Sequence, residues 1–154
     1  MFNLLFIGLA TITINFVNPQ TTIKDIDITE TVELVEQVCT DLELGDVDVY
    51  LFENTDNFTV GEQIIYGCIY KGFWVIGTND IYLNVTKNDT NTIVHELRHM
   101  WQYENGLFVD YIYSNNGKNV RAYRGQPLEQ DARAFDSAYF NNELCDYINL
   151  MPEN

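Results

Sequence analysis

Both histidines of this 154-residue sequence lie four positions apart, in the segment HELRH at 95–99. Residues i and i+4 of an α-helix face the same side one turn apart, so both imidazoles can reach a single metal ion. Capping residues at 87–91 precede the segment, and Asn105-Gly106, a common helix stop, follows it. The pattern therefore predicts a helix over 92–104 that binds a metal, with zinc as the expected ion.

Glu96 follows the first histidine, so on a helix its carboxylate points beside the metal rather than at it. There it can accept a proton from a metal-activated water and later pass it to a leaving amine. Glu96 is therefore the expected general base. A chain of this length buries roughly 68–70% of its unfolded surface without a metal, so a bound metal is expected to serve function rather than folding.

A hydrolytic zinc site normally has three protein ligands and one open position. No third histidine exists and the three cysteines have no obvious place near the motif, so we expect a carboxylate as the third ligand. Glu129 is the expected residue, because it lies early in a helix predicted from Pro127 to about Asn141. Asp131, about 200° round that helix, is the alternative, as the ligand or as an acceptor for the N–H of a ligand histidine.

Hydrophobic periodicity predicts the other elements. Residues 28–40 have helical spacing, residues 46–52 are typical of a strand, and an antiparallel set of strands is expected over 64–70, 73–77 and 80–86. No internal repeat or low-complexity run occurs, so we expect a single domain over 1–154. The expected fold class is α+β, with a mainly antiparallel sheet packed against helices.

The first 20 residues allow two interpretations. Residues 11–16 alternate apolar and polar side chains, as a half-buried strand does. Residues 2–17 are nearly uncharged, as in a signal or anchor segment, but no Lys or Arg precedes them and they are short for a membrane span. We expect an internal strand and a cytoplasmic protein; a signal segment, with a secreted or N-terminally anchored protein, is the alternative.

Charge excludes one class of partner. The chain has 8 Lys and Arg against 23 Asp and Glu, for a formal net charge of -15. This field repels phosphate backbones, so nucleic-acid binding is not expected, whereas a basic substrate would be attracted. The three cysteines, Cys39, Cys68 and Cys145, do not suit a disulfide framework, and we expect buried free thiols.

HELRH, followed by a helix that carries Pro127-Leu-Glu129-Gln-Asp131-Ala132-Arg133-Ala-Phe135, resembles the small gluzincin metallopeptidases. These are the minigluzincins and, more distantly, the ImmA/IrrE-type zincins encoded near mobile elements. The resemblance covers residues 80–140. It implies a zincin-like fold in which His95, His99 and Glu129 bind zinc and Glu96 is the general base.

The resemblance also bears on the surroundings of the metal. Gluzincins often carry Asp or Asn four residues after the ligand Glu, where it can orient a ligand histidine, but this chain has Arg133 there. Asp131 or Asp136 would then take that role. In zincins the strand before the active-site helix is commonly a sheet edge that holds an extended substrate, and Ile81 to Val85 occupies that place.

A tetrahedral intermediate needs a hydrogen-bond donor at its oxyanion. Tyr123 is the expected donor, with Tyr111 and Tyr113 behind it, and Arg98 and Arg124 are alternatives. Arg98, inside the motif, is expected rather to extend into solvent or to pair with an acid.

The expected function is zinc-dependent hydrolysis of peptide bonds in a peptide or protein substrate. The alternative is a catalytically inactive zincin-fold protein that acts as a binding module or as a structural component of a virion or mobile element. An intact Glu96 favours the enzyme, because a purely structural metal site has no use for a general base.

Overall fold

The computed structural model describes residues 11–19, 27–112 and 120–141. Its elements in chain order are β1 (Ile12–Phe16), α1 (Thr29–Asp41), β2 (Val47–Phe52), β3 (Asn57–Val60), β4 (Gln63–Tyr66), β5 (Gly72–Trp74), β6 (Asp80–Asn84), α2 (Thr90–Glu104), α3 (Val120–Gly125) and α4 (Pro127–Phe140). The expected α+β class is correct. α1, α2 and α4 match the three predicted helices, whereas the sequence patterns do not predict β3 or α3.

The main sheet is mixed rather than mainly antiparallel. Its strand order is β1-β2-β6-β5, with β1, β2 and β6 parallel and β5 antiparallel to β6. The expected antiparallel pairing holds for β5 with β6, but β4 pairs with β3 in a separate hairpin. Gly61, with a φ of 59°, lies in the turn of that hairpin, where a positive φ suits glycine. The chain thus leaves the sheet after β2, re-enters it through β5 in the opposite direction, and then turns into β6, which runs parallel to β2.

β1 confirms the interpretation of residues 11–16 as a strand. It pairs in parallel with β2, with Ile14 opposite Val49, and the Thr11 N–H donates to Asp46 Oδ1 at 2.8 Å. The signal or anchor alternative also concerns residues 1–10, which lie outside the described residues. No helix in the described ranges is both long and apolar enough to cross a membrane.

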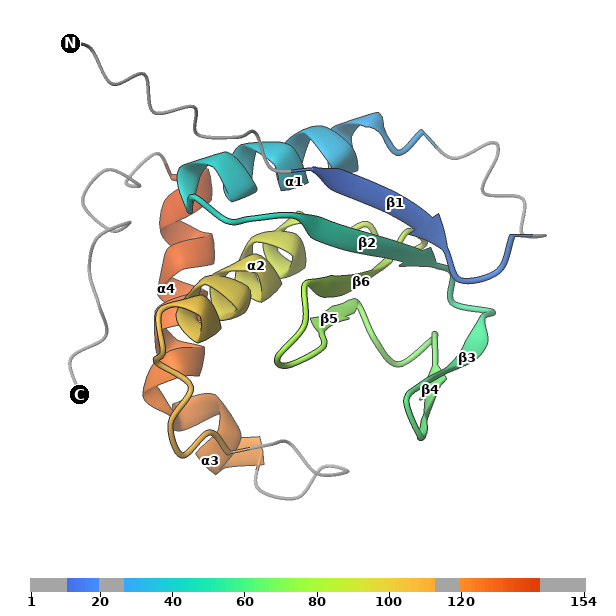
Figure 1. Cartoon of the computed structure of the whole chain (residues 1–154). Coiled ribbons are helices and arrows are strands. Elements are labelled where there is room, and N and C mark those ends of the chain that lie inside the picture. The colour runs from blue at the N-terminus through green and yellow to red at the C-terminus, as the bar shows by residue number, and fades with distance from the viewer. Residues whose placement is uncertain (1–10, 20–26, 113–119, 142–154) are drawn as a thin grey trace, which may run out of the picture.

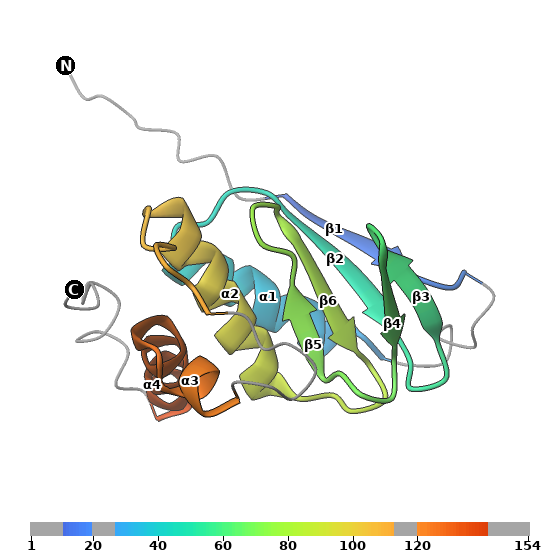
Figure 2. The same cartoon turned by 90° about the horizontal axis from the view of Figure 1, so that it is seen from below.

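α1 and α2 cover one face of the sheet, and α4 packs across α2 on the side away from the strands (Figure 1, Figure 2). The core between sheet and helices is aliphatic, and its fully buried side chains include Val35, Val38, Val49, Leu51, Ile81 and Leu97. Each such side chain contributes about 1.5–3 kcal/mol when it leaves water. This packing holds α2 from both sides and so fixes the orientation of the HELRH segment.

Local signals set the ends of α2, which stops at Glu104 as predicted and begins at Thr90 rather than at the predicted Thr92. The Asp89 side chain caps the helix by accepting a hydrogen bond from the Thr92 N–H at 3.0 Å. Asn105 ends the helix, and Gly106 follows with a φ of 73°. The position of both histidines along α2 is therefore fixed by short-range interactions.

The cysteines only partly follow the expectation of buried free thiols. Cys39 is free and buried, and burial raises the pKa of its thiol to about 12. Cys68 is free but exposed, because it lies in the turn after β4 rather than in an element packed on the core. Cys145 lies outside the described residues.

Candidate metal centre

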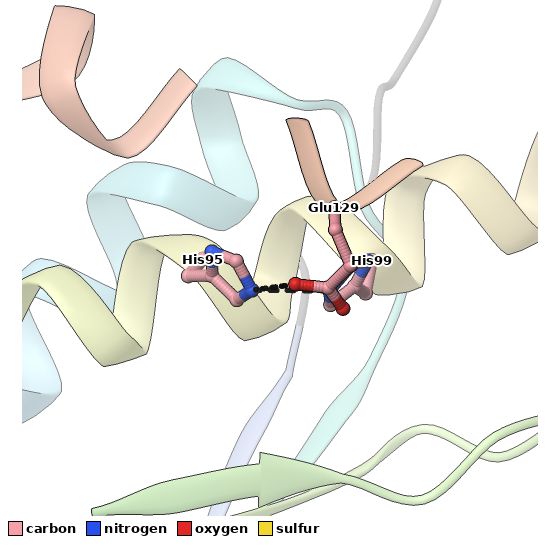
Figure 3. A group of neighbouring side chains, drawn as sticks. All are labelled: His95, His99 and Glu129. Carbon is pink, nitrogen blue, oxygen red and sulfur yellow. Dashed lines mark hydrogen bonds and ion pairs between the residues drawn. The ribbon is translucent and has the colours of Figure 1, made fainter. Parts of the chain in front are cut away.

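Three side chains from two crossing helices meet at one point. His95 and His99 come from successive turns of α2, and Glu129 comes from the first turn of α4. Glu129 Oε2 lies 3.3 Å from His95 Nε2, Glu129 Oε1 lies 3.0 Å from His99 Nε2, and the two Nε2 atoms are 3.1 Å apart. Figure 3 shows the imidazoles and the carboxylate gathered at this point. Each of the three expected ligands thus offers an atom within 4.8 Å of the others, close enough to hold one metal ion.

The environment of Glu129 fits a cation. The residue is completely buried, which costs free energy for a carboxylate unless charge or hydrogen bonds compensate. Its Oε1 accepts a hydrogen bond from the Tyr111 hydroxyl at 2.6 Å. Its Oε2 is buried and accepts no hydrogen bond from the described residues, although it faces His95. A divalent ion bound by Oε2 and both imidazoles would satisfy this atom.

The electrostatics of the group also favour a cation. Burial disfavours charge on His95, but the interaction with Asp136 and the nearby Glu129 carboxylate outweigh it and raise the pKa of the imidazole to about 10. Burial likewise opposes ionisation of Glu129, yet the close approach of both histidines outweighs it and lowers the pKa of the carboxyl. The site therefore stabilises positive charge between the imidazoles and the carboxylate.

Gln102, which sequence reasoning missed, fixes His99. Its Oε1 lies 2.8 Å from His99 Nδ1, while its Nε2 donates to Asp131 Oδ2 at 2.7 Å and to the Leu128 carbonyl at 2.9 Å. Both amide hydrogens are engaged, so Gln102 presents its oxygen to His99. The Nδ1 atom then carries the proton, and Nε2 keeps its lone pair for a metal. The only sequence signal is that Gln102 follows His99 by three positions on the same helix.

Asp131, the alternative ligand, does not belong to the group of three within the described residues. Its carboxylate pairs with Arg98, with Oδ2 2.8 Å from Nε and Oδ1 3.2 Å from Nη2. Arg98 is completely buried, and its guanidinium lies 3.8 Å from the centre of the Trp101 ring. Of its two expected outcomes, Arg98 therefore pairs with an acid and does not extend into solvent.

Asp136 takes the place beside the first histidine. Its Oδ2 lies 3.3 Å from His95 Nδ1, the role expected of either Asp131 or Asp136. Asp131 instead is connected to His99 through Gln102. Arg133, at the position where gluzincins often have Asp or Asn, is exposed.

Glu96 lies at the wall of a cleft of about 640 Å³ beside this group. β5 and several aromatic side chains, among them Phe108, line the same cleft. Glu96 Oε2 accepts a hydrogen bond from the Trp74 N–H at 3.1 Å, and burial raises the pKa of its carboxyl. The expected general base and the expected ligand His99 therefore face one cavity.

Two of the expected oxyanion donors, Tyr111 and Tyr123, also line the cleft, with ring centres 6.2 Å apart. Burial raises the pKa of both phenols and Glu129 raises it further, so both keep their proton. Tyr111 already donates its proton in the hydrogen bond to Glu129 Oε1, which favours Tyr123 as the oxyanion donor. Tyr113 lies outside the described residues, and Arg124 is exposed on α3 and not among the residues described as lining the cleft.

The expectation that Ile81 to Val85 forms a free sheet edge is wrong. Most of these residues belong to β6, which pairs with β2 on one side and with β5 on the other. The edge strand that borders the cleft is β5, because the chain segment before β6 folds back and pairs with β6. The candidate site therefore still faces a sheet edge, formed by a different strand.

The chain matches no protein-family model, no curated protein and no solved structure. The resemblance to gluzincins therefore rests on HELRH and the α4 segment alone, and the case for a function rests on the geometry of the site.

Proposed function

We propose that the protein is a zincin-like, zinc-dependent peptide-bond hydrolase with His95, His99 and Glu129 as metal ligands. The observation that carries the proposal is the convergence of these residues beside Glu96, at a cleft. Two imidazoles and one carboxylate are a common catalytic zinc set, which leaves a position open. Zinc bound there would supply a Lewis acid that polarises a carbonyl and lowers the pKa of water.

The chain's own side chains would carry the other steps. Glu96, held at the cleft wall by the Trp74 N–H, would accept a proton from the attacking water and pass it to the leaving amine. Tyr123 is the proposed donor to the oxyanion. β5 is an edge strand that borders the same cleft, so an extended peptide has backbone groups with which to pair besides the Trp74 N–H, which Glu96 occupies. The net charge of -15 favours a peptide or protein substrate over a nucleic acid.

Elemental analysis of the purified protein tests the metal site. We expect about one zinc per chain in the wild type and loss of most of it in Glu129→Ala, because two imidazoles alone form an incomplete set. Glu30→Ala, which removes an exposed glutamate of α1, should leave the zinc content unchanged. A folded wild-type protein that takes up no zinc would contradict the proposal.

Glu96→Gln tests the chemistry. The amide keeps an oxygen for the Trp74 N–H but cannot take a proton from water, so we expect normal zinc content and hydrolysis reduced by about 100-fold or more. Mass spectrometry of a mixed peptide digest incubated with each protein measures the cleavage. An active Glu96→Gln protein would exclude Glu96 as the base. A zinc-loaded wild type that cleaves no peptide would favour the inactive binding module.

A further inference from the structure

A second pocket, of about 500 Å³, borders the candidate metal group at His95. Its volume lies within the range typical of ligand pockets. It differs in character from the aromatic cleft beside His99, because its lining is polar: Lys71, Asp89, Asn91, Thr92, His95, Arg133 and Asp136. His95 lines the polar pocket and His99 lines the aromatic cleft. A substrate bound at the metal would therefore lie next to both cavities.

Two cations line this polar pocket in a chain that has few. Lys71 lies just before β5 and Arg133 lies on α4, and the sequence has only 8 Lys and Arg against 23 Asp and Glu. The carboxylates of the pocket are already engaged. Asp89 caps α2 and binds Lys71 at 2.6 Å, and Asp136 lies 3.3 Å from His95 Nδ1. The two carboxylates of the pocket are therefore already in use, whereas its two cations still have N–H groups that can donate to a ligand.

Arg133 retains more of these N–H donors than Lys71 does. Within the described residues its guanidinium makes one ion-pair contact, from Nη2 to Glu129 Oε2 at 3.7 Å, and its side chain is 46% exposed. A divalent ion bound by Glu129 would repel a guanidinium so close to it, unless an anion lay nearby. A carboxylate from the substrate would offset this repulsion and match the fork of N–H donors that arginine presents.

We propose that Lys71 and Arg133 bind a carboxylate of the substrate on the His95 side of the cleaved bond. The inference rests on the proposed function and names its substrate class, which is peptides with an acidic group next to that bond. The group is either the terminal carboxylate of the peptide or the side chain of Asp or Glu. A chain with net charge -15 repels anions in general, so a local pair of cations is needed to admit one at this position.

Calorimetry on the zinc-loaded full chain tests the inference without requiring turnover. The first pair of probes is N-[3-(hydroxycarbamoyl)propanoyl]-leucine and its carboxamide, which share a metal-binding hydroxamate and differ in the terminal charge. The second pair carries the same hydroxamate on Leu-Glu-amide and Leu-Gln-amide. We expect the acidic member of one pair to bind about tenfold more tightly than its neutral partner. The pair that shows this difference identifies a terminal or a side-chain carboxylate.

Variants assign the preference to the pocket. Arg133→Gln and Lys71→Gln should each bring the affinity ratio of acid to amide close to one, with the affinity for the neutral probe retained. Arg121→Gln, which removes an exposed cation of α3, should leave the ratio unchanged. Thermal unfolding curves check that every variant is folded.

The outcomes separate this inference from the proposed function. Equal binding of acid and amide in both pairs by the wild type would overturn the carboxylate pocket and leave the hydrolase proposal standing. A folded chain that binds no zinc, or that binds zinc but none of the four probes, would overturn both.

Discussion

Gln102 connects the candidate metal centre to the buried pair of Arg98 and Asp131. Its amide nitrogen is held by Asp131 and the Leu128 carbonyl, so its oxygen has to face His99. One neutral side chain thereby sets the tautomer of a proposed ligand. Partners of this kind commonly contribute about 10–100-fold to metal affinity.

Gln102→Ala should therefore weaken zinc binding by about 10–100-fold, because His99 is no longer held with Nε2 toward Glu129. Competition with a chromogenic chelator measures the affinity, and circular dichroism checks the fold. Gln37→Ala, on the exposed side of α1, is the matched control and should bind zinc as the wild type does. Unchanged affinity in a folded Gln102→Ala protein would mean that this amide does not orient His99.

At the scale of single residues, the sequence predicts the positions of side chains that regular helical spacing determines. His95 and His99 share a face of α2 because they are four positions apart, and the predicted helix that begins at Pro127 places Glu129 in its first turn. The donor that holds Glu129 has no such signal. Tyr111 reaches it from the irregular segment after α2, whose path no periodicity fixes.

At the scale of elements, length and end signals decide what can be predicted. α2 and α4 have 15 and 14 residues with apolar faces and recognisable termini, so their patterns are specific. β3 has only 4 residues, too few for a periodic pattern. The direction of β6 relative to β2 depends on the excursion through β3 and β4, and no local pattern encodes such a path.

β5 lies close against its neighbours at Gly72, which gives an element-scale prediction. A Cβ at this position would lie 2.8 Å from the Tyr82 carbonyl oxygen and 3.0 Å from Thr92 Cγ2. Gly72→Ala should therefore lower the free energy of unfolding by about 1–3 kcal/mol, as measured by urea denaturation. At Gly125 an added Cβ meets nothing within 4 Å, so Gly125→Ala should change stability little. Equal stability of the two variants would show that β5 moves away from β6 without cost.

At the scale of the whole molecule, the core and the candidate site occupy different layers. The aliphatic core lies between the sheet and the helices, whereas the proposed ligands lie where α2 meets α4. The core is complete without the metal ligands, so the fold is expected to persist without a metal.

Removal of zinc with a chelator should therefore leave a folded chain with a lower midpoint of thermal unfolding. Free zinc at about 100 times its dissociation constant stabilises a folded protein by about 2.7 kcal/mol. For a chain of this size that corresponds to a rise of about 5–11 °C, which scanning calorimetry measures. Glu129→Ala should show no such rise. Outright unfolding on chelation would instead assign the metal a structural role.

The hydrogen bond from Trp74 to Glu96 also affects how copies of the chain meet in concentrated solution. β5 is an open edge of the main sheet, and free N–H groups on such an edge can recruit a strand from another molecule. This edge is only 3 residues long, and Glu96 occupies the Trp74 N–H. Glu96→Gln keeps an acceptor there, whereas Glu96→Ala releases the donor. The choice between these two variants therefore decides whether the sample is also made prone to aggregate.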